Sequence, residues 1–329
     1  MGVNKTSKKS PSMRSSSPAS GSLNLAMRAR YLFEYLLFLT ASLVFSRLPT
    51  KMAHGLGRGL GKVAFVLDSR HRRIAMENLR IALRDGRSEN EIRDLARASF
   101  FHLTSALVEI CRYREFRKGP VERFVDFEGV PRVIEAREGG RGIVLITGHL
   151  GAWELGALAA PMIGYPLEVV FRPLDNPYLD RWLVRARSST GNRAIPKKNA
   201  LRPILSSLQK GGMIVVLMDL NTMRSEGVFV DFFGRLASTT YAPALLALRT
   251  GAAVFPILTL RQEERRLKVI VGEEIPLLSS GSLQKDLVDN TARFTKVLEG
   301  YIREHPEQWF WPHERWKTRP KGRGSNRRL

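Results

Sequence analysis

The chain has 329 residues, 43% of them hydrophobic, which is enough apolar material for one large α/β domain or two small ones. Lys and Arg number 53 against 31 Asp and Glu, and the resulting net charge of +22 indicates an anionic partner: nucleic acid, an anionic membrane, an acidic protein or a phosphorylated substrate. The single cysteine, Cys111, excludes an intramolecular disulfide and a metal site built from cysteines. Because it lies in a helical pattern, we expect it in the core.

The N-terminal region combines a basic segment with an apolar one. Residues 1–30 contain six basic residues, no acidic residue and much Ser, Pro and Gly, which is typical of a disordered basic arm. The apolar run 31–46 contains Glu34 and is shorter than the roughly 20 residues that span a bilayer comfortably. No small-residue cleavage site follows it, which argues against a signal peptide. We expect a membrane-anchoring helix over 31–50, and spanning, re-entrant and in-plane arrangements all remain open.

The next hundred residues have helical patterns. Four alternating glycines occur within residues 55–61, but no clear strand precedes them, so close helix packing or a membrane-apposed segment is favoured over a phosphate-binding loop. Apolar spacing predicts a helix over 70–83. Ser88 and Glu91 form a capping-box pattern that opens another helix, ending near Tyr113.

From residue 142 onward, short β-rich runs alternate with helical patterns. This alternation predicts an α/β fold with a mainly parallel sheet flanked by helices. The expected strands are 142–147, 168–172, 213–218, 253–260 and 267–271, and the expected helices are 152–160, 178–188, 200–210, 241–250 and 283–304.

A histidine and a glutamate follow the first of these strands. The run 143–147 ends at Gly148, and His149 and Glu154 come next. Residues five apart on one α-helix do not face each other, so a turn that leads into a helix is needed to bring this pair together. The pattern therefore predicts a base and its orienting carboxylate at the C-terminal end of a strand, a common position for active sites. The alternative is a partly buried histidine near an acidic residue in the first turn of a helix.

Four motifs, taken together and in order, resemble the lipid A biosynthesis late (lauroyl/myristoyl) acyltransferases, within the wider lysophospholipid and glycerolipid acyltransferase group. The likeness extends from about residue 31 to 318, which predicts an acyltransferase domain over 51–318 and a basic tail over 319–329. The last motif is the most specific, because the wider group has a His-x4-Asp pattern similar to the first. The motifs are GHLGAWE at 148–154, FRPLDNPYLD at 171–180, GVFVDFFG with AST at 227–239, and HPEQWFWPHERWK at 305–317.

The resemblance implies transfer of a fatty acyl chain from acyl carrier protein to a hydroxyl of a lipid A precursor, at the cytoplasmic side of the bacterial inner membrane. His149 would take the hydroxyl proton, and Glu154 would hold the imidazole tautomer. No acyl-enzyme, metal or other cofactor is expected. The expected partners are acyl carrier protein, a phosphorylated glycolipid acceptor and an anionic membrane, and no nucleic acid.

Three further residues are predicted to bind substrate. Arg172 closes a strand, where it could pair with an anionic headgroup or stabilise an oxyanion, unless it forms a salt bridge with a nearby aspartate. Asn176 belongs to the same motif but precedes a proline and could simply form a turn. Asp219 could position His149 or the substrate, or cap the following turn. Family members often have Asp-Gln there, whereas this chain has Leu220 after the aspartate, so no role is carried over to that position.

Three tryptophans near the C-terminus, Trp309, Trp311 and Trp316, alternate with charged residues. They could stack on nucleic acid, lie at lipid headgroup depth, or pack in the core while the cations face solvent, and the resemblance favours the last two.

Two other functions of the chain remain as alternatives. One is acylation of a different glycolipid or a lysophospholipid, and the other is a non-enzymatic, basic, membrane-associated binding protein.

Overall fold

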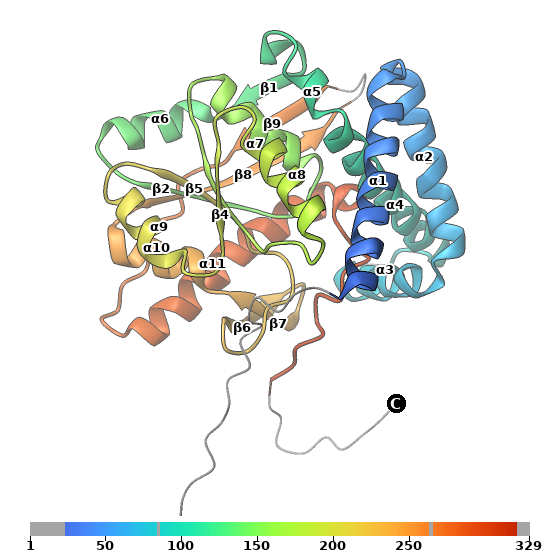
Figure 1. The fold of residues 1–329 in the computed structure, drawn as a ribbon. Helices are drawn as coiled ribbons and strands as arrows, with labels where there is room; N and C mark the ends of the chain where they lie inside the picture. Colours follow the sequence, from blue (N-terminus) through green and yellow to red (C-terminus); the bar gives the residue numbers. More distant parts are fainter. Residues whose placement is uncertain (1–23, 84–85, 263–265, 321–329) are drawn as a thin grey trace, which may run out of the picture.

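The structure is a computed structural model that describes residues 24–83, 86–262 and 266–320 (Figure 1). Most of the predicted basic arm and residues 321–329 of the predicted tail lie outside the described residues. The first helix, α1 (Leu25–Arg47), begins earlier than expected, so residues 25–30 are helical rather than part of the arm. The Asn24 side chain caps this helix by accepting a hydrogen bond from the Ala26 amide at 3.2 Å.

The N-terminal third forms a layer of helices beside the sheet (Figure 1). It comprises α1, α2 (Thr50–Leu67), α3 (Ser69–Ala82), α4 (Glu89–Cys111) and the short α5 (Tyr113–Phe116). The capping box at the start of α4 is confirmed, because the Ser88 side chain accepts from the Glu91 amide and the Glu91 carboxylate accepts from the Ser88 amide. Cys111 is buried at the end of this helix, as expected.

Helices α2 and α4 are in close contact because of two glycines. A Cβ atom at Gly57 would lie 2.9 Å from Cγ2 of Val108, and one at Gly61 would lie 2.8 Å from Cδ1 of Phe101. Both glycines are buried, whereas the other two glycines of the alternating set meet open space. The predicted close helix packing is confirmed for these two positions.

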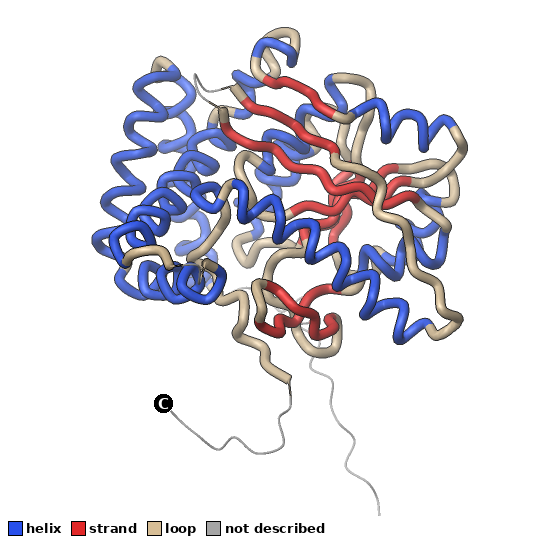
Figure 2. The backbone as a smooth tube through the Cα atoms, turned by 180° about the vertical axis from the view of Figure 1, so that it is seen from behind, coloured by secondary structure: helices blue, strands red, loops and turns tan. Residues whose placement is uncertain are grey.

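A seven-stranded sheet runs through the centre of the molecule, as Figure 2 shows from behind. Strand β8 pairs in parallel with β2, and β5, β3 and β4 continue in parallel from β2, whereas β9 is antiparallel to β8 and β1 is parallel to β9. The mainly parallel sheet predicted from the sequence is confirmed. In the order β1-β9-β8-β2-β5-β3-β4, the strands are Val125–Glu128, Leu267–Val271, Ala253–Arg261, Ile143–Thr147, Met213–Leu217, Glu168–Phe171 and Arg193–Pro196.

Helices cover both faces of the sheet. The central strand β2 buries Val144 and Ile146 against one face and Ile143 and Leu145 against the other, which explains why its sequence is apolar throughout. Helices α9 (Leu201–Leu208), α10 (Ala242–Thr250) and α11 (Leu283–Glu304) pack on the first face. Helices α6 (Val130–Glu138), α7 (Trp153–Met162) and α8 (Pro177–Arg187) pack on the second.

Several short elements have no counterpart in the sequence analysis. These are strands β1 and β4, helix α6, the 3-10 turns η1 (Val121–Arg123) and η3 (Pro306–Gln308), and a separate antiparallel hairpin of β6 (Gly227–Phe232) and β7 (Arg235–Thr240).

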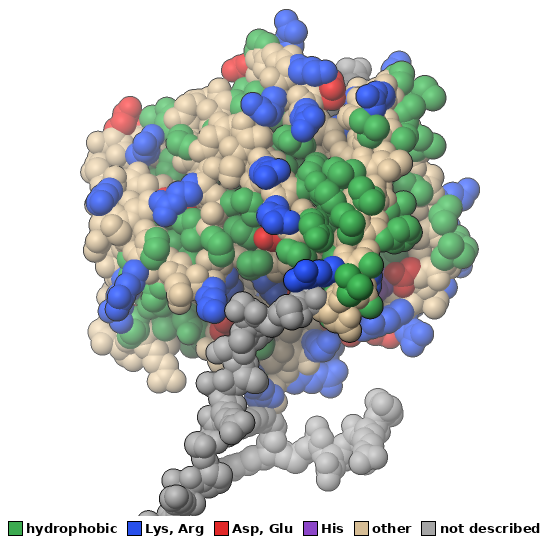
Figure 3. Space-filling view, in the orientation of Figure 1, with side chains coloured by type: hydrophobic (Ala, Val, Ile, Leu, Met, Phe, Trp, Pro, Cys, Tyr) green, Lys and Arg blue, Asp and Glu red, His purple; other side chains and the backbone are tan. Residues whose placement is uncertain are grey.

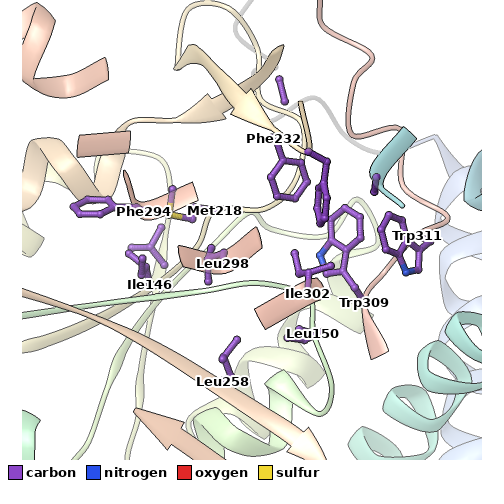
Figure 4. Packing of buried hydrophobic residues seen from close by; sticks show 14 of the residues in the cluster. Ile146, Leu150, Met218, Phe232, Leu258, Phe294, Leu298, Ile302, Trp309 and Trp311 are labelled. Carbon is purple, nitrogen blue, oxygen red and sulfur yellow. The ribbon is translucent and has the colours of Figure 1, made fainter. Parts of the chain in front are cut away.

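The C-terminal tryptophans are core residues. Trp309 and Trp311 have no exposed surface and Trp316 retains 5%, which confirms the core interpretation and not the headgroup one. Figure 4 shows Trp309 between Phe232 of the hairpin and the end of α11. The cations do not all face solvent, because Arg315 is also buried, stacked over Phe232 with its Cζ 4.9 Å from the ring centroid.

Candidate active site

His149 and Asp219 meet at the C-terminal edge of the sheet. Strands β2 and β5 are parallel neighbours with Thr147 opposite Leu217, so the residues that follow them share one edge. The His149 amide donates to Asp219 Oδ2 at 2.6 Å, and the imidazole Nδ1 lies 2.9 Å from Asp219 Oδ1. Gly148 permits this approach, since a Cβ there would lie 2.9 Å from the carboxylate. Of the three roles open to Asp219, positioning His149 matches this geometry.

The Asp219 carboxylate is held as a buried anion. Its side chain is 1% exposed, and the Trp309 indole N–H donates to Oδ2 at 2.7 Å. Burial alone would raise the pKa of Asp219, but the interactions with His149 and Trp309 outweigh burial and lower the pKa below its ordinary value. A carboxylate in this state fixes the Nδ1–H tautomer of His149.

Glu154 does not contact His149. It lies in the first turn of α7 and faces the last turn of α8, where Arg187 donates from Nη2 to Oε1 at 2.5 Å and from Nε to Oε2 at 3.0 Å. The turn after β2 therefore places His149 beside the end of β5, and it places Glu154 beside α8. The expected orienting contact between Glu154 and the imidazole is not formed, because Asp219 lies against Nδ1 of His149 instead. A catalytic role of Glu154 stays a prediction. The pair with Glu154 raises the pKa of Arg187 although burial, the larger influence, lowers it.

The second ring nitrogen of His149 is available for chemistry. With Nδ1 donating to Asp219, the Nε2 lone pair points elsewhere, and it has no hydrogen-bond partner among the described residues. The side chain is 22% exposed. Trp153 lies on one side with its ring centroid at 5.2 Å, and Phe310 lies at 6.3 Å. The imidazole is thus a fixed and reachable proton acceptor in an aromatic environment.

Arg172 and Asn176 have different surroundings. Arg172 follows β3 at the same sheet edge, is exposed, and forms no salt bridge with the nearby Asp175 or Asp180 within the part of the chain that the structure describes. Asn176 is buried and caps α8, with Oδ1 accepting from the Tyr178 amide at 3.0 Å. Its Nδ2 donates to the carbonyl of Tyr31 and to Glu34 Oε2 in α1. These contacts give Asn176 a structural role, and its predicted contact with substrate stays a prediction.

Two residues beside the site were not predicted to belong to it. Trp309 holds Asp219, and His313 accepts a hydrogen bond from the Asn221 amide through Nε2 at 3.0 Å. Burial is the main reason that the pKa of His313 falls to about 4, so it is neutral at physiological pH. Both residues lie in the last motif, which the sequence analysis singled out as the most specific. Its signal was present, but the link to Asp219 depends on the fold.

No group of three or more His, Cys, Asp or Glu side chains that could hold a metal ion occurs among residues 24–83, 86–262 and 266–320. The candidate site is therefore described by protein side chains alone.

Comparison with known proteins places the chain. Residues 23–318 match the family model described as bacterial lipid A biosynthesis acyltransferase. The chain is 29% identical over 281 residues to a lipid A biosynthesis lauroyltransferase of Escherichia coli, covering 84% of this chain and 89% of that protein. It is 26% identical to a palmitoleoyltransferase of lipid A biosynthesis from the same organism, covering 85% and 89%. A phosphatidylinositol mannoside acyltransferase of Mycolicibacterium smegmatis is 30% identical over 167 residues, covering 50% and 55%. The chain therefore belongs to the bacterial lipid A biosynthesis acyltransferase family.

Proposed function

We propose that this acyltransferase transfers a fatty acyl chain from an acyl carrier protein thioester to a hydroxyl of a phosphorylated lipid A precursor, with His149 as general base. The observation that carries the proposal is the hydrogen bond between His149 Nδ1 and the buried Asp219 carboxylate, which leaves Nε2 as a proton acceptor. Asp219 takes the orienting role that the sequence assigned to Glu154.

The reaction then needs no acyl-enzyme. The acceptor hydroxyl oxygen attacks the thioester carbonyl carbon while its proton passes to His149 Nε2, and a C–O bond forms. The tetrahedral species then breaks its C–S bond, and the departing thiolate takes the proton from the imidazolium. General base assistance of this kind contributes about 10²–10⁴-fold in rate. Asp219 stabilises the imidazolium through Nδ1, as the acid does in serine hydrolases.

Arg172 is proposed to bind an anionic group of the acceptor. It is exposed at the same sheet edge as His149, and its guanidinium has no hydrogen bond or ion pair to other described residues. A guanidinium matches the geometry of a phosphate oxygen pair. Arg187 is less suited to this task because Glu154 already holds it in a bidentate pair.

The exposed apolar side chains of α1 and α2 support a location of the enzyme at the membrane surface. Among the described residues, α1 is the one helix long and apolar enough to cross a bilayer, yet it packs on the domain through Phe38 and Trp182. Exposed apolar side chains continue from α1 onto α2, where Leu56 and Leu60 are half exposed. Figure 3 shows apolar side chains gathered around α1 with Lys and Arg beside them. We place the enzyme in-plane on the inner membrane, on the cytoplasmic side where acyl carrier protein is found.

Mass spectrometry of lipid A tests the proposal. A strain lacking the chain should produce lipid A that lacks one acyl group, and the wild-type gene should restore it. His149→Ala should fail to restore it, whereas His71→Ala, a change at a half-buried histidine paired with Asp68, should succeed. Unchanged lipid A in the deletion strain would refute the lipid A assignment. A mass deficit in a different glycolipid would favour the alternative acceptor. With purified enzyme, acyl carrier protein thioesters should support transfer better than coenzyme A thioesters.

A further inference from the structure

A second polar cluster lies behind the active site. Arg261, the last residue of β8, forms a buried bidentate pair with Glu109 of α4, with Nε to Oε1 at 2.8 Å and Nη2 to Oε2 at 2.7 Å. Their side chains are 12% and 8% exposed. The Arg261 backbone is held by the Gln308 amide, which accepts from N at 2.9 Å and donates to O at 3.1 Å. Glu109 therefore fixes the guanidinium of Arg261 while Gln308 fixes its backbone, and the proposed acyl transfer uses neither.

The third guanidinium nitrogen sets the state of a second histidine. Arg261 Nη1 lies 3.2 Å from Nδ1 of His102 in α4. A guanidinium can only donate hydrogen bonds, so Nδ1 of His102 must be the acceptor and the ring proton must lie on Nε2. Burial, with Arg261 nearby, lowers the pKa of His102 to about 3, so the ring is neutral at physiological pH. His102 Nε2–H is thus a donor of defined direction with no partner among the described residues.

This donor and the proposed base share one pocket. His102 and His149, together with Trp153 and Phe310, line the same narrow crevice between α4 and the active-site loop. The crevice is too tight for a water molecule in this structure, so a bound thioester has to part these side chains to reach both histidines. Among these residues, the two histidines are complementary. Nε2 of His149 can accept a proton, whereas Nε2 of His102 can donate a hydrogen bond.

We propose that His102 is a catalytic residue that donates a hydrogen bond from Nε2 to the thioester carbonyl oxygen and stabilises the oxyanion of the tetrahedral species. This inference rests on the proposed function. When the acceptor oxygen bonds to the carbonyl carbon, the carbonyl electron pair moves onto oxygen and His149 takes the hydroxyl proton. When the C–S bond breaks, that pair re-forms the carbonyl and the thiolate leaves with the proton from His149. His102 keeps its own proton throughout, and Arg261 acts as a positioning residue that fixes its tautomer.

Kinetics of purified full-length variants test this role, with acyl carrier protein carrying a dodecanoyl or tetradecanoyl thioester as donor and a lipid A precursor as acceptor. His102→Leu should lower kcat by about 10²–10³-fold, the usual effect of removing one oxyanion donor, with little change in KM. His102→Gln places an amide N–H near the lost Nε2–H, so it should recover at least about tenfold of that loss. His71→Leu is the matched control and should keep the wild-type kcat.

Two results would overturn the inference. The first is a kcat for His102→Leu within about twofold of wild type, in an enzyme that does transfer acyl chains. The second is an equal loss in the Leu and Gln variants accompanied by a lowered melting temperature, which is the result expected of a purely structural residue. Absence of transfer by the wild-type enzyme would instead refute the proposed function, so the two failures are distinguishable.

The tautomer of His102 can be measured directly, without relying on turnover. In the ¹⁵N spectrum of the histidine-labelled wild-type protein at neutral pH, His102 should show an unprotonated Nδ1 and a protonated Nε2. A protonated Nδ1 on His102 would overturn the inference, because the donor would then face Arg261.

Discussion

The C-terminal edge of the sheet and the layer of α1 and α2 distribute their side chains in opposite ways. At the sheet edge, charged groups are inside: Asp219 is 3% exposed, and the pair of Glu109 and Arg261 is also largely covered. On the helical layer, apolar groups are outside: Leu37 and Leu56 expose 62% and 50% of their surface. Both arrangements oppose the usual hydrophobic-inside pattern of a water-soluble protein.

The two regions differ in where their side chains find favourable partners. Buried charges cost free energy unless they are paired and hydrogen-bonded, and the buried charges of Asp219, Glu109 and Arg261 all have such partners. Exposed apolar surface has no partner within the described chain, so the favourable free energy of covering it is still available to a lipid surface. The buried charges therefore have their partners inside the chain, whereas the exposed apolar surface would gain a partner at the proposed membrane. The predictions below alter one region at a time.

The largest effect is expected from breaking the buried pair of His149 and Asp219. Asp219→Asn keeps the shape but removes the charge that fixes the Nδ1–H tautomer, so kcat should fall by about 10³–10⁴-fold. The measurement is steady-state acyl transfer, with circular dichroism to verify folding. Asp94→Asn, at an exposed carboxylate on α4, should leave kcat unchanged. A fully active Asp219→Asn enzyme would contradict the proposed role of the pair.

The next effect concerns the exposed apolar layer. Leu56→Glu and Leu60→Glu should each weaken binding to vesicles that contain phosphatidylglycerol by about tenfold, because the apolar area of each leucine would no longer be buried in lipid. Co-sedimentation measures this binding. The same changes at Leu236 of β7 and at Leu278 in the loop before α11, which are similarly exposed, serve as controls and should have little effect. Equal losses from both pairs would indicate a general charge effect and contradict the assigned surface.

A smaller effect is expected where the helical layer packs on itself. Gly61→Ala would place a Cβ 2.8 Å from Phe101 Cδ1 and from Thr104 Oγ1, which is closer than van der Waals contact. The free energy of unfolding should therefore fall by about 1–3 kcal/mol. Gly59→Ala, two residues earlier on α2 and facing open space, should be neutral or stabilising by up to about 1 kcal/mol. Urea denaturation in mild detergent measures both. Equal destabilisation by the two changes would mean that helix contact is not what selects glycine at residue 61.

The smallest effect should be a shift in pH dependence. Trp309→Phe removes the indole hydrogen bond that favours the charged form of Asp219, so the pKa of this carboxyl should rise. The His149 and Asp219 pair would then take up a proton at a higher pH, and the acid limb of the kcat/KM profile should move upward. Trp316→Phe, whose indole donates to the Arg235 carbonyl instead, should leave the limb in place. A downward shift in the Trp309 variant would contradict this sign.

Sequence patterns located the long elements and the position of His149 after β2, but not the carboxylate that contacts His149. The apolar run of β2 and the capping box of α4 are local signals, and both were located correctly. The partner of His149 depends on which strand lies beside β2, and β5 begins 66 residues after β2 ends at Thr147. Glu154 was chosen because it is near in sequence, whereas parallel pairing makes Asp219 near in space. Short strands such as β4 carry too few residues to show a period.

The capping of α8 by Asn176 links α1 to the loop that carries Arg172. Asn176 lies four residues after Arg172, and its side chain holds both the start of α8 and the α1 backbone at Tyr31. With α1 seated on lipid, the loop that carries Arg172 would keep a constant height above the headgroups, because no flexible linker separates the two. Acceptor lipids would then be selected by how far their phosphates and hydroxyls rise from the bilayer, in addition to their chemistry.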